Sequence, residues 1–184
     1  VHYRYSHILR LFHRIFFHLK INTIFKDLVT NIDVSKINKC HAHFLFSDGA
    51  VALRLYKKEG IPYIVAVRNT DINIFYKYMY HLRSAGLEIL NNAEQVVFIT
   101  PSYRSLLLEK YIPAKFREIL NLKMKVIPNV IESYWLNNVP QKNHSHSGPL
   151  KLLYVGDFSQ NKNIPTLLKC VHELNQPNIK TTLT

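Results

Sequence analysis

Residues 39–71 read KCHAHFLFSDGAVALRLYKKEGIPYIVAVRNTD, and they carry the strongest fold signal in the chain. The apolar run at 40–46 predicts a short buried strand. Polar residues at 47–48 can cap a helix that ends at Gly60, where a left-handed residue commonly closes a helix. The β-branched run 62–68 predicts a second strand. This order of elements predicts two parallel strands joined by a helix.

The same alternation of elements continues C-terminal to this segment. Because each predicted strand is apolar on both faces, the pattern indicates a parallel sheet with helices on both sides. The predicted fold class is therefore α/β, a Rossmann-like parallel sheet flanked by helices. The further expected elements are a helix over 72–90, a strand over 95–99, a helix over 101–110 capped by Thr100, a short helix after Pro113 and a strand over 123–127.

Residues 137–149, NNVPQKNHSHSGP, are polar and rich in Pro, Asn and Ser, which predicts an exposed linker. We therefore expect an N-terminal Rossmann-like domain over 1–136 and the start of a second such domain over 150–184. Because the chain opens on Val1 and stops inside this second unit, we expect a fragment in which both domains are incomplete. The second unit is predicted to hold a strand over 151–155, a helix capped by Asn161 or Asn163, and a strand over 178–183.

The charge is strongly positive and unevenly placed. The chain has 24 Lys and Arg against 12 Asp and Glu, and the first acidic residue is Asp27. A helix over Ser6–Lys20 would be basic on one face and apolar on the other, which suits an anionic membrane surface; the alternative is a surface helix with a solvated basic face. The basic face would hold His7, Arg10, Arg14 and His18, and the apolar face Ile8, Phe12, Ile15, Phe16 and Leu19.

A nucleic-acid partner is not expected from this charge. A high net charge invites the idea, but the chain has no zinc-finger spacing, no aromatic RNP-like strand and no basic recognition helix. Cys40 and Cys170 are too few for a disulfide framework and suit a reducing compartment. No apolar run reaches the roughly 20 residues that span a bilayer. We therefore predict a cytoplasmic protein, which the membrane interpretation of the Ser6–Lys20 helix would make peripheral on the inner face of the plasma membrane.

Candidate site residues follow the predicted strands, because ligands of open parallel sheets bind where the carboxyl ends of the strands meet. Each candidate has a plainer alternative: a helix cap for 47–49, an Asx turn capping the next helix for 68–71, a hinge turn at 128–129, and a glycine turn with a solvated lysine at 156–162. The candidates are Ser47 and Gly49; Arg68, Asn69, Thr70 and Asp71; Asn129; and Gly156 and Lys162.

Several other kinds of chemistry lack a signal in the sequence. His41 and His43 share one face of a strand, but no further ligand completes a metal site, so no metal is expected. The chain contains no Gly-x-Ser-x-Gly, no Gly-x-Gly-x-x-Gly and no phosphate-binding P-loop. No residue is singled out as catalytic.

Four segments in order resemble the group 1, or family 4, retaining glycosyltransferases of the GT-B fold. Residues 39–71 resemble that family's strand–helix–strand, which ends in a His-Gly-Thr-Asp-like turn, and 93–107 resemble its strand with a serine-led helix. The segment KVIPNVIESYW at 125–135 is similar to the family's Ile-Pro-Asn-Gly segment. The segment 151–174 is similar to its Val-Gly-Arg segment with a following lysine.

The resemblance implies sugar transfer with retention from a nucleotide-sugar donor to a saccharide or lipid-linked acceptor, as in bacterial surface polysaccharide synthesis, without a metal or other cofactor. It places Ser47, Gly49, Asn129 and residues 68–71 on the acceptor side. It places Gly156 and Lys162 at the donor diphosphate, where a cation stabilises the leaving group. The alternatives are a non-catalytic saccharide- or partner-binding relative and, further off, a basic nucleic-acid-binding module.

The sequence also departs from the family pattern. Arg68 replaces a histidine, Val130 a glycine, Glu132 an aspartate, and Asp157 an arginine of the phosphate clamp. Neither the family's glycine-rich loop nor its distal Glu-x7-Glu region occurs in the chain. We therefore expect this chain alone to be inactive.

Overall fold

A computed structural model describes residues 7–139, 150–175 and 181–184. The chain divides into two compact units, Val1–Val130 and Ile131–Thr184, and each is considered by itself. Within the described residues, no helix is both long and apolar enough to cross a membrane. The predicted linker over 137–149 lies almost wholly outside the described residues.

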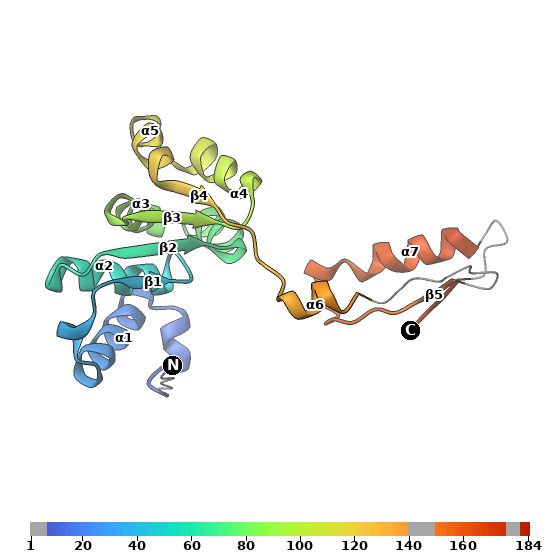
Figure 1. Cartoon of the computed structure of the whole chain (residues 1–184), viewed down its shortest axis with the longest axis horizontal. Helices are drawn as coiled ribbons and strands as arrows, with labels where there is room; N and C mark the ends of the chain where they lie inside the picture. The colour runs from blue at the N-terminus through green and yellow to red at the C-terminus, as the bar shows by residue number, and fades with distance from the viewer. Residues whose placement is uncertain (1–6, 140–149, 176–180) are drawn as a thin grey trace. The chain divides into compact units, whose positions relative to one another are not determined.

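The first unit is built on a four-stranded parallel sheet in the order β1-β2-β3-β4 (Figure 1). Each pair of neighbouring strands is parallel; His41 pairs with Ile64 in the first pair, and Val97 pairs with Lys125 in the last. This sheet with its flanking helices confirms the predicted Rossmann-like α/β fold. The strands are β1 (Cys40–Ala42), β2 (Tyr63–Val67), β3 (Gln95–Phe98) and β4 (Met124–Val126).

Helices connect the strands in sequence. The α-helices are α1 (Phe17–Asn31), α2 (Ser47–Glu59), α3 (Arg83–Asn92), α4 (Pro101–Leu106) and α5 (Ala114–Lys123). Shorter 3₁₀ turns are η1 (Leu11–Arg14), η2 (Val34–Lys36) and η4 (Tyr80–Leu82), and π-helical turns are η3 (Asp71–Tyr76) and η5 (Leu107–Tyr111). The caps expected at Gly60 and Thr100 are confirmed: Gly60 ends α2 with φ of 70°, and the Thr100 hydroxyl accepts the N–H of Tyr103 at the start of α4. The cap expected at 47–48 is wrong, because Ser47 already lies inside α2 and the N-cap position is held by Phe46, which makes no side-chain cap bond.

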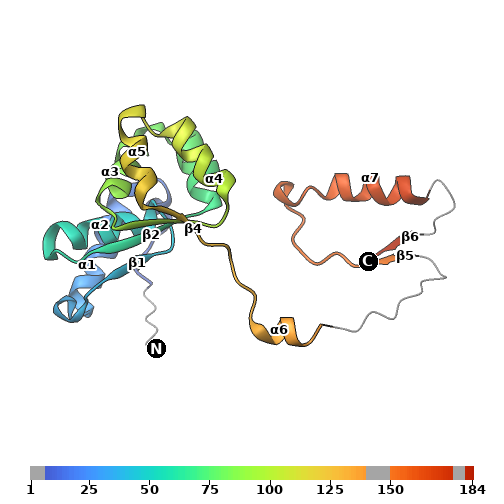
Figure 2. The ribbon, with the colours of Figure 1, turned by 45° about the horizontal axis from the view of Figure 1, so that its top comes forward.

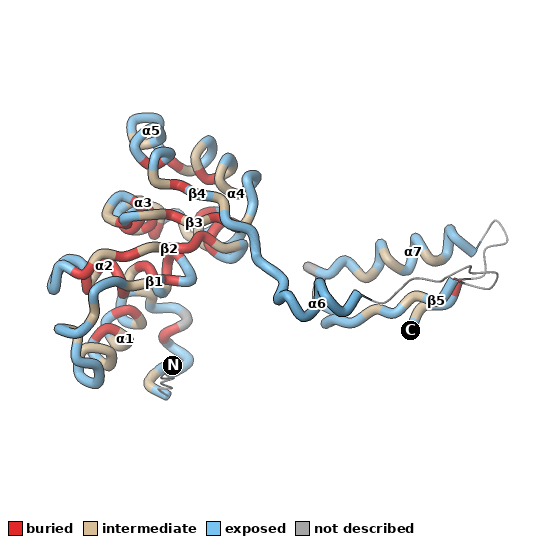
Figure 3. Tube along the Cα trace, in the orientation of Figure 1, coloured by how far each residue is buried: buried red, intermediate tan, exposed pale blue. Residues whose placement is uncertain are grey.

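The hydrophobic core lies on one face of the sheet. Figure 3 shows the buried stretches in the strands and on the helices around them. Because the strands follow one another in spatial order, right-handed crossovers place their connecting helices on a common side. The opposite face bears His41, Ile64, Gln95, Val97 and Lys125 and belongs to no described hydrophobic cluster. Among the described residues the expected second layer of helices is therefore missing.

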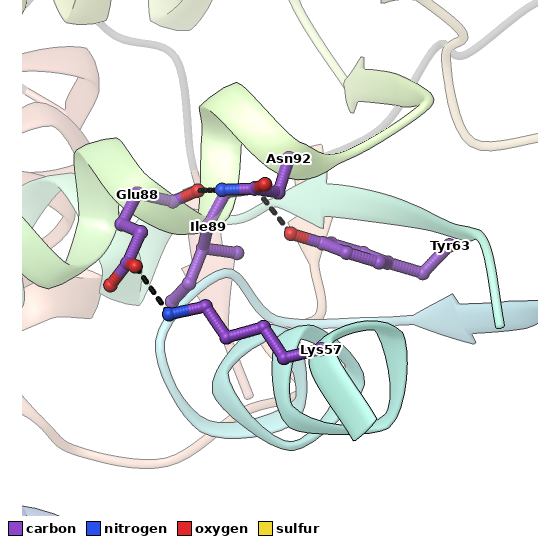
Figure 4. Close-up of polar contacts among 5 residues, drawn as sticks. All are labelled: Lys57, Tyr63, Glu88, Ile89 and Asn92. Carbon is purple, nitrogen blue, oxygen red and sulfur yellow. Dashed lines mark hydrogen bonds and ion pairs between the residues drawn. The ribbon is translucent and has the colours of Figure 1, made fainter. Parts of the chain in front are cut away.

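A buried tyrosine joins the sheet to α3. The Tyr63 hydroxyl donates a hydrogen bond of 2.6 Å to the Ile89 carbonyl (Figure 4). Nearby, Lys57 of α2 forms an ion pair with Glu88 of α3, and Asn92 donates to the Glu88 carbonyl at 2.8 Å. Burial raises the pKa of Tyr63 well above its ordinary value, so the hydroxyl stays a donor.

The single helix predicted over 72–90 is wrong. The chain leaves helical geometry at Met79, with φ of −101° and ψ of 67°, and forms η3, η4 and α3 instead. Arg83 explains the break, because its Nε and Nη2 donate to the Tyr76 carbonyl at 2.8 and 2.6 Å. A side chain thus satisfies a carbonyl that a continuous helix would have bonded with its own backbone.

The helix predicted over Ser6–Lys20 is also wrong. Leu11–Arg14 form a 3₁₀ turn, Phe16 is not helical, and α1 begins only at Phe17. The predicted basic and apolar faces therefore do not form. His13 provides the physical reason, because it is buried and bonded on both ring nitrogens to groups outside η1.

The second unit contains a parallel β-α-β arrangement in which β5 (Leu150–Leu152) pairs with β6 (Thr181–Leu183) (Figure 2). Between the strands lie the 3₁₀ turn η6 (Gln160–Lys162) and α7 (Ile164–Asn175), and α6 (Ser133–Asn137) precedes them. Asn163, one of the two expected caps, immediately precedes α7 and accepts a hydrogen bond from the Thr166 hydroxyl at 2.9 Å. The Asn161 side chain lies outside the described residues.

Candidate functional site

The loops at the carboxyl ends of β1 and β2 are joined by one buried carboxylate. Asp71 is 1% exposed, and its oxygens accept the backbone N–H groups of Leu45, Phe46 and Arg68 at 3.1, 3.2 and 2.9 Å. Burial raises the pKa of Asp71, and the three hydrogen bonds act in the opposite direction. With both oxygens engaged, Asp71 holds the two loops together. It does not cap the helical turn η3 that it begins, because the N-cap position of η3 is Thr70 and no side-chain cap bond forms there.

Arg68 spans the edge of the sheet from β2 toward the segment after β4. Its Nε donates to the His43 carbonyl at 3.3 Å, and its Nη1 donates to Asn129 Oδ1 at 3.4 Å. The Ile127 N–H bonds to the Phe98 carbonyl at 2.8 Å and holds the segment that carries Asn129. The structure thus brings together two predicted site residues that are far apart in sequence.

These two residues border a groove of about 360 Å³ on the open face of the sheet. Its floor is apolar, and its polar groups come from His41, Gln95, Arg68 and Asn129. The lining residues are His41, Ile64, Ala66, Arg68, Gln95, Val97, Phe98, Ile99, Ile127, Pro128, Asn129 and Val130. Of these polar groups, Arg68 and Asn129 follow the carboxyl ends of β2 and β4, where parallel sheets bind ligands, whereas His41 and Gln95 lie further along the open face.

Asn69 and Thr70 are exposed beside this cluster. Asn69 Oδ1 accepts a hydrogen bond from Asn73 Nδ2, and the same Nδ2 lies 3.4 Å from Tyr103 Oη. Asn73 and Tyr103 were not expected at the site. Their positions in the sequence could have indicated a place at the site. Asn73 lies four residues after Asn69, one helical turn away, and Tyr103 follows Thr100, which caps the helix after β3.

His41 and His43 lie side by side, although the strand predicted over 40–46 ends at Ala42 and His43 lies in the loop that follows. Their ring centroids are 4.5 Å apart. Partial burial lowers the pKa of His41, and the neighbouring His43 and Arg68 act in the same direction. Among the described residues, no three His, Cys, Asp or Glu side chains gather where they could hold a metal ion.

Ser47 and Gly49 do not line the groove beside Arg68. The Ser47 hydroxyl donates to Asp48 Oδ1 at 3.1 Å and lines another groove, of about 250 Å³, at the free edge of β1. Gly49 is buried inside α2, where its N–H donates to the Phe44 carbonyl at 2.9 Å. A Cβ there would lie 2.9 Å from Ile89 Cγ2, so close packing explains this glycine.

Gly156 and Lys162 lie in the second unit. The Tyr154 hydroxyl donates to the Asp157 carbonyl at 2.8 Å, and a Cβ at Gly156 would lie 2.6 Å from that hydroxyl oxygen. Gly156 therefore leaves room for Tyr154. Lys162 is exposed and ends η6 two residues before α7 begins. Asp157 Oδ1 accepts a hydrogen bond from the Ser159 hydroxyl at 3.0 Å.

No protein-family model matches the chain, and no curated protein matches it. The class that the structure defines is an α/β protein with a Rossmann-like parallel sheet and a polar cluster at its carboxyl edge. Any function is therefore inferred from the geometry of this cluster.

Proposed function

We propose that the protein serves as a retaining glycosyltransferase that passes a sugar from a nucleotide-sugar donor to a saccharide or lipid-linked acceptor in bacterial surface polysaccharide synthesis. The observation that carries the proposal is the pairing of Arg68 with Asn129 above an apolar groove at the carboxyl edge of a parallel sheet. This edge is where open α/β sheets bind their ligands. The order of the four resembling segments adds support.

The side chains at this edge suit an acceptor sugar. A saccharide presents hydroxyl groups that both donate and accept hydrogen bonds, together with apolar C–H surfaces. Amide groups at Asn69, Asn73 and Asn129 offer both functions, and the Arg68 guanidinium carries five donors, more than its two bonds use. The apolar floor of the groove suits the C–H faces.

Lys162 would serve the donor diphosphate in the second unit. It is exposed and lies just before the N-terminus of the 12-residue helix α7, where the helix dipole favours negative charge. A lysine there would offset the charge that builds on the leaving nucleoside diphosphate. Asp157 carries a carboxylate that accepts a hydrogen bond from Ser159, so it adds no positive charge for binding a diphosphate.

Binding measured residue by residue tests the proposal. The whole chain, labelled with ¹⁵N, is titrated with UDP-glucose, GDP-mannose and ADP-glucose, and separately with a panel of oligosaccharides. We expect a nucleotide sugar to shift amides near Lys162 and an oligosaccharide to shift amides near Arg68. Lys162→Met and Arg68→Met should weaken the respective binding about tenfold or more, the value of one charge-assisted hydrogen bond.

Matched variants separate a site effect from a general loss of charge. Lys169→Met removes an exposed lysine from α7, and Arg104→Met removes an arginine that bonds Asn121 across α4 and α5. Both should bind the ligands as the unchanged chain does. If neither nucleotide sugars nor saccharides bind to a folded chain, the proposal fails.

A second candidate is a non-catalytic saccharide-binding relative. Asp157 favours it, because a carboxylate stands where the resemblance expects an arginine. The titration separates the two functions: saccharide binding at Arg68 without nucleotide-sugar binding at Lys162 supports the second candidate.

A further inference from the structure

The N-terminal segment exposes a cluster of large apolar side chains. Leu11 and Ile15 are each 79% exposed, and Phe16 is 58% exposed. We call this cluster the apolar knuckle; it consists of Leu9, Leu11, Phe12, Ile15, Phe16 and Leu19. Single exposed apolar residues are ordinary, but six of them within the 11 residues from Leu9 to Leu19 indicate an interaction surface.

A buried histidine holds the knuckle in shape. His13 is 6% exposed, and its Nδ1 accepts the backbone N–H of Arg10 at 2.8 Å. Because Nδ1 accepts, the ring donates from Nε2 to the Thr23 hydroxyl at 3.2 Å, and that hydroxyl donates to the Leu19 carbonyl at 3.0 Å. This chain of bonds fixes η1 against α1, so the exposure of Leu11 and Ile15 belongs to an ordered turn.

In the sequence, the charged residues next to the knuckle are all basic. Arg10 lies among its residues and Lys20 directly follows them, and no carboxylate precedes Asp27. A groove of about 280 Å³ joins Ile15–Leu19 to His81 and Leu82. Beside these two residues, Tyr78 and Tyr80 are 61% and 66% exposed, and Lys77 and Arg83 contact their rings.

We propose that the apolar knuckle inserts into the interface of a bilayer rich in anionic lipids. Exposed apolar side chains with basic residues next to them in the chain, and tyrosines beside the adjoining groove, match the layered chemistry of that interface. Charge selects this occupant: a second copy of the chain would bring the same cations face to face, whereas anionic headgroups complement them. The inference does not depend on the proposed sugar transfer.

Vesicle binding tests the apolar contribution. The whole chain is sedimented with vesicles of phosphatidylcholine alone and of phosphatidylcholine mixed equally with phosphatidylglycerol. We expect binding to the mixed vesicles only. The double variant Leu11→Ser, Ile15→Ser should lower the partition coefficient at least about tenfold, given the value of burying two such side chains. The matched variant Ile119→Ser, Leu122→Ser removes two apolar residues of α5 that are also more than half exposed, and it should bind unchanged.

The electrostatic contribution is tested separately. Arg10→Gln and Lys20→Gln should each weaken binding about fivefold, the value of one basic residue near an anionic surface. Raising the salt concentration should weaken the unchanged chain in the same way. Lys115→Gln, which changes an exposed lysine of α5, is the matched control.

Fluorescence distinguishes insertion from adsorption. In a Trp135→Phe background, Phe16→Trp provides the sole tryptophan, and its emission should shift to the blue on mixed vesicles. Because the altered knuckle residues are exposed, circular dichroism and thermal unfolding should match those of the unchanged chain. An unshifted emission, equal vesicle binding by both double variants, or a dimer that only the knuckle variant dissociates would overturn the proposal.

Discussion

The carboxylate of Asp71 accepts the backbone N–H of Leu45 at 3.1 Å, across 26 positions of sequence. The same carboxylate accepts the N–H of Phe46 and of Arg68, so it fixes the loop after β1 against the loop after β2. Arg68 begins at this fixed point and reaches Asn129 beyond β4. The geometry of the candidate acceptor site therefore depends on a residue that is itself buried.

Removing this carboxylate should destabilise the first unit strongly. Asp71→Ala leaves the N–H groups of Leu45, Phe46 and Arg68 without their acceptor, and each unsatisfied buried group costs about 1–3 kcal/mol. We expect the free energy of unfolding, measured by urea denaturation, to fall by about 3 kcal/mol or more.

The control for this variant is Asp48→Ala, which removes an exposed carboxylate from the first turn of α2. It should cost less than about 1 kcal/mol through the helix dipole. Equal losses of stability in the two variants would show that the Asp71 hydrogen bonds do not tie the loops together.

Two buried tyrosines should respond differently to loss of the hydroxyl. Tyr63→Phe removes the bond to the Ile89 carbonyl, but that carbonyl still accepts the Ala93 N–H, so the expected cost is about 1 kcal/mol. The Tyr76 hydroxyl is buried and has no hydrogen-bond partner among the described residues, so Tyr76→Phe should be neutral or stabilising. Urea unfolding of both variants checks this order, and a larger loss in Tyr76→Phe would contradict it.

The sequence allowed the sheet to be predicted because its strands are short apolar runs separated by clear helix signals. Gly60 and Thr100 marked helix ends correctly, since a left-handed glycine and a hydroxyl cap act locally. The break at Met79 and the start of α1 at Phe17 depend instead on Arg83 and His13. A helical periodicity does not reveal that a side chain will bond a backbone group outside its own turn.

The geometry of the candidate site could be predicted only in part. Arg68 and Asn129 meet because the ends of parallel strands meet, a consequence of topology that the sequence order already contains. The burial of Asp71 was not predicted, because its partners include two N–H groups 25 and 26 residues away. Gly49 was assigned to a ligand because a glycine after a strand can serve either a ligand or close packing.

Close packing predicts that Gly49→Ala is destabilising even though alanine favours helices. The new Cβ would lie 2.9 Å from Ile89 Cγ2 and 3.2 Å from Val65 Cγ2, both in the core. Overpacking of this kind costs about 1–3 kcal/mol, of which the helix propensity of alanine returns up to about 1 kcal/mol. Urea unfolding measures the difference, and a variant more stable than the unchanged chain would contradict the packing role.

His41 should make the stability of the first unit depend on pH. Its pKa in the folded chain lies below the ordinary 6.5, so the unfolded chain takes up the proton first as the pH falls. His41 therefore makes its full contribution to the free energy of unfolding above pH 6.5. This contribution declines as the pH falls toward the lowered pKa.

An NMR titration of the His41 ring measures this pKa directly. Arg68→Met removes the guanidinium that helps to lower the His41 pKa, so it should raise this pKa toward 6.5. Arg104→Met removes an arginine that bonds Asn121 instead and should leave the titration unchanged. A His41 pKa at or above 6.5 in the unchanged chain would rule out the predicted pH dependence.

The two free thiols should differ in reactivity toward a disulfide reagent such as Ellman's. Cys170 is exposed on α7, whereas Cys40 is only partly exposed at the start of β1, where burial raises its pKa. The thiolate is the reacting species, so Cys40 should react more slowly, by about tenfold or more at neutral pH. Stopped-flow absorbance should therefore resolve a fast and a slow phase of equal amplitude. Cys170→Ser should abolish the fast phase and Cys40→Ser the slow one; the reverse assignment would show that Cys40 is the more accessible thiol.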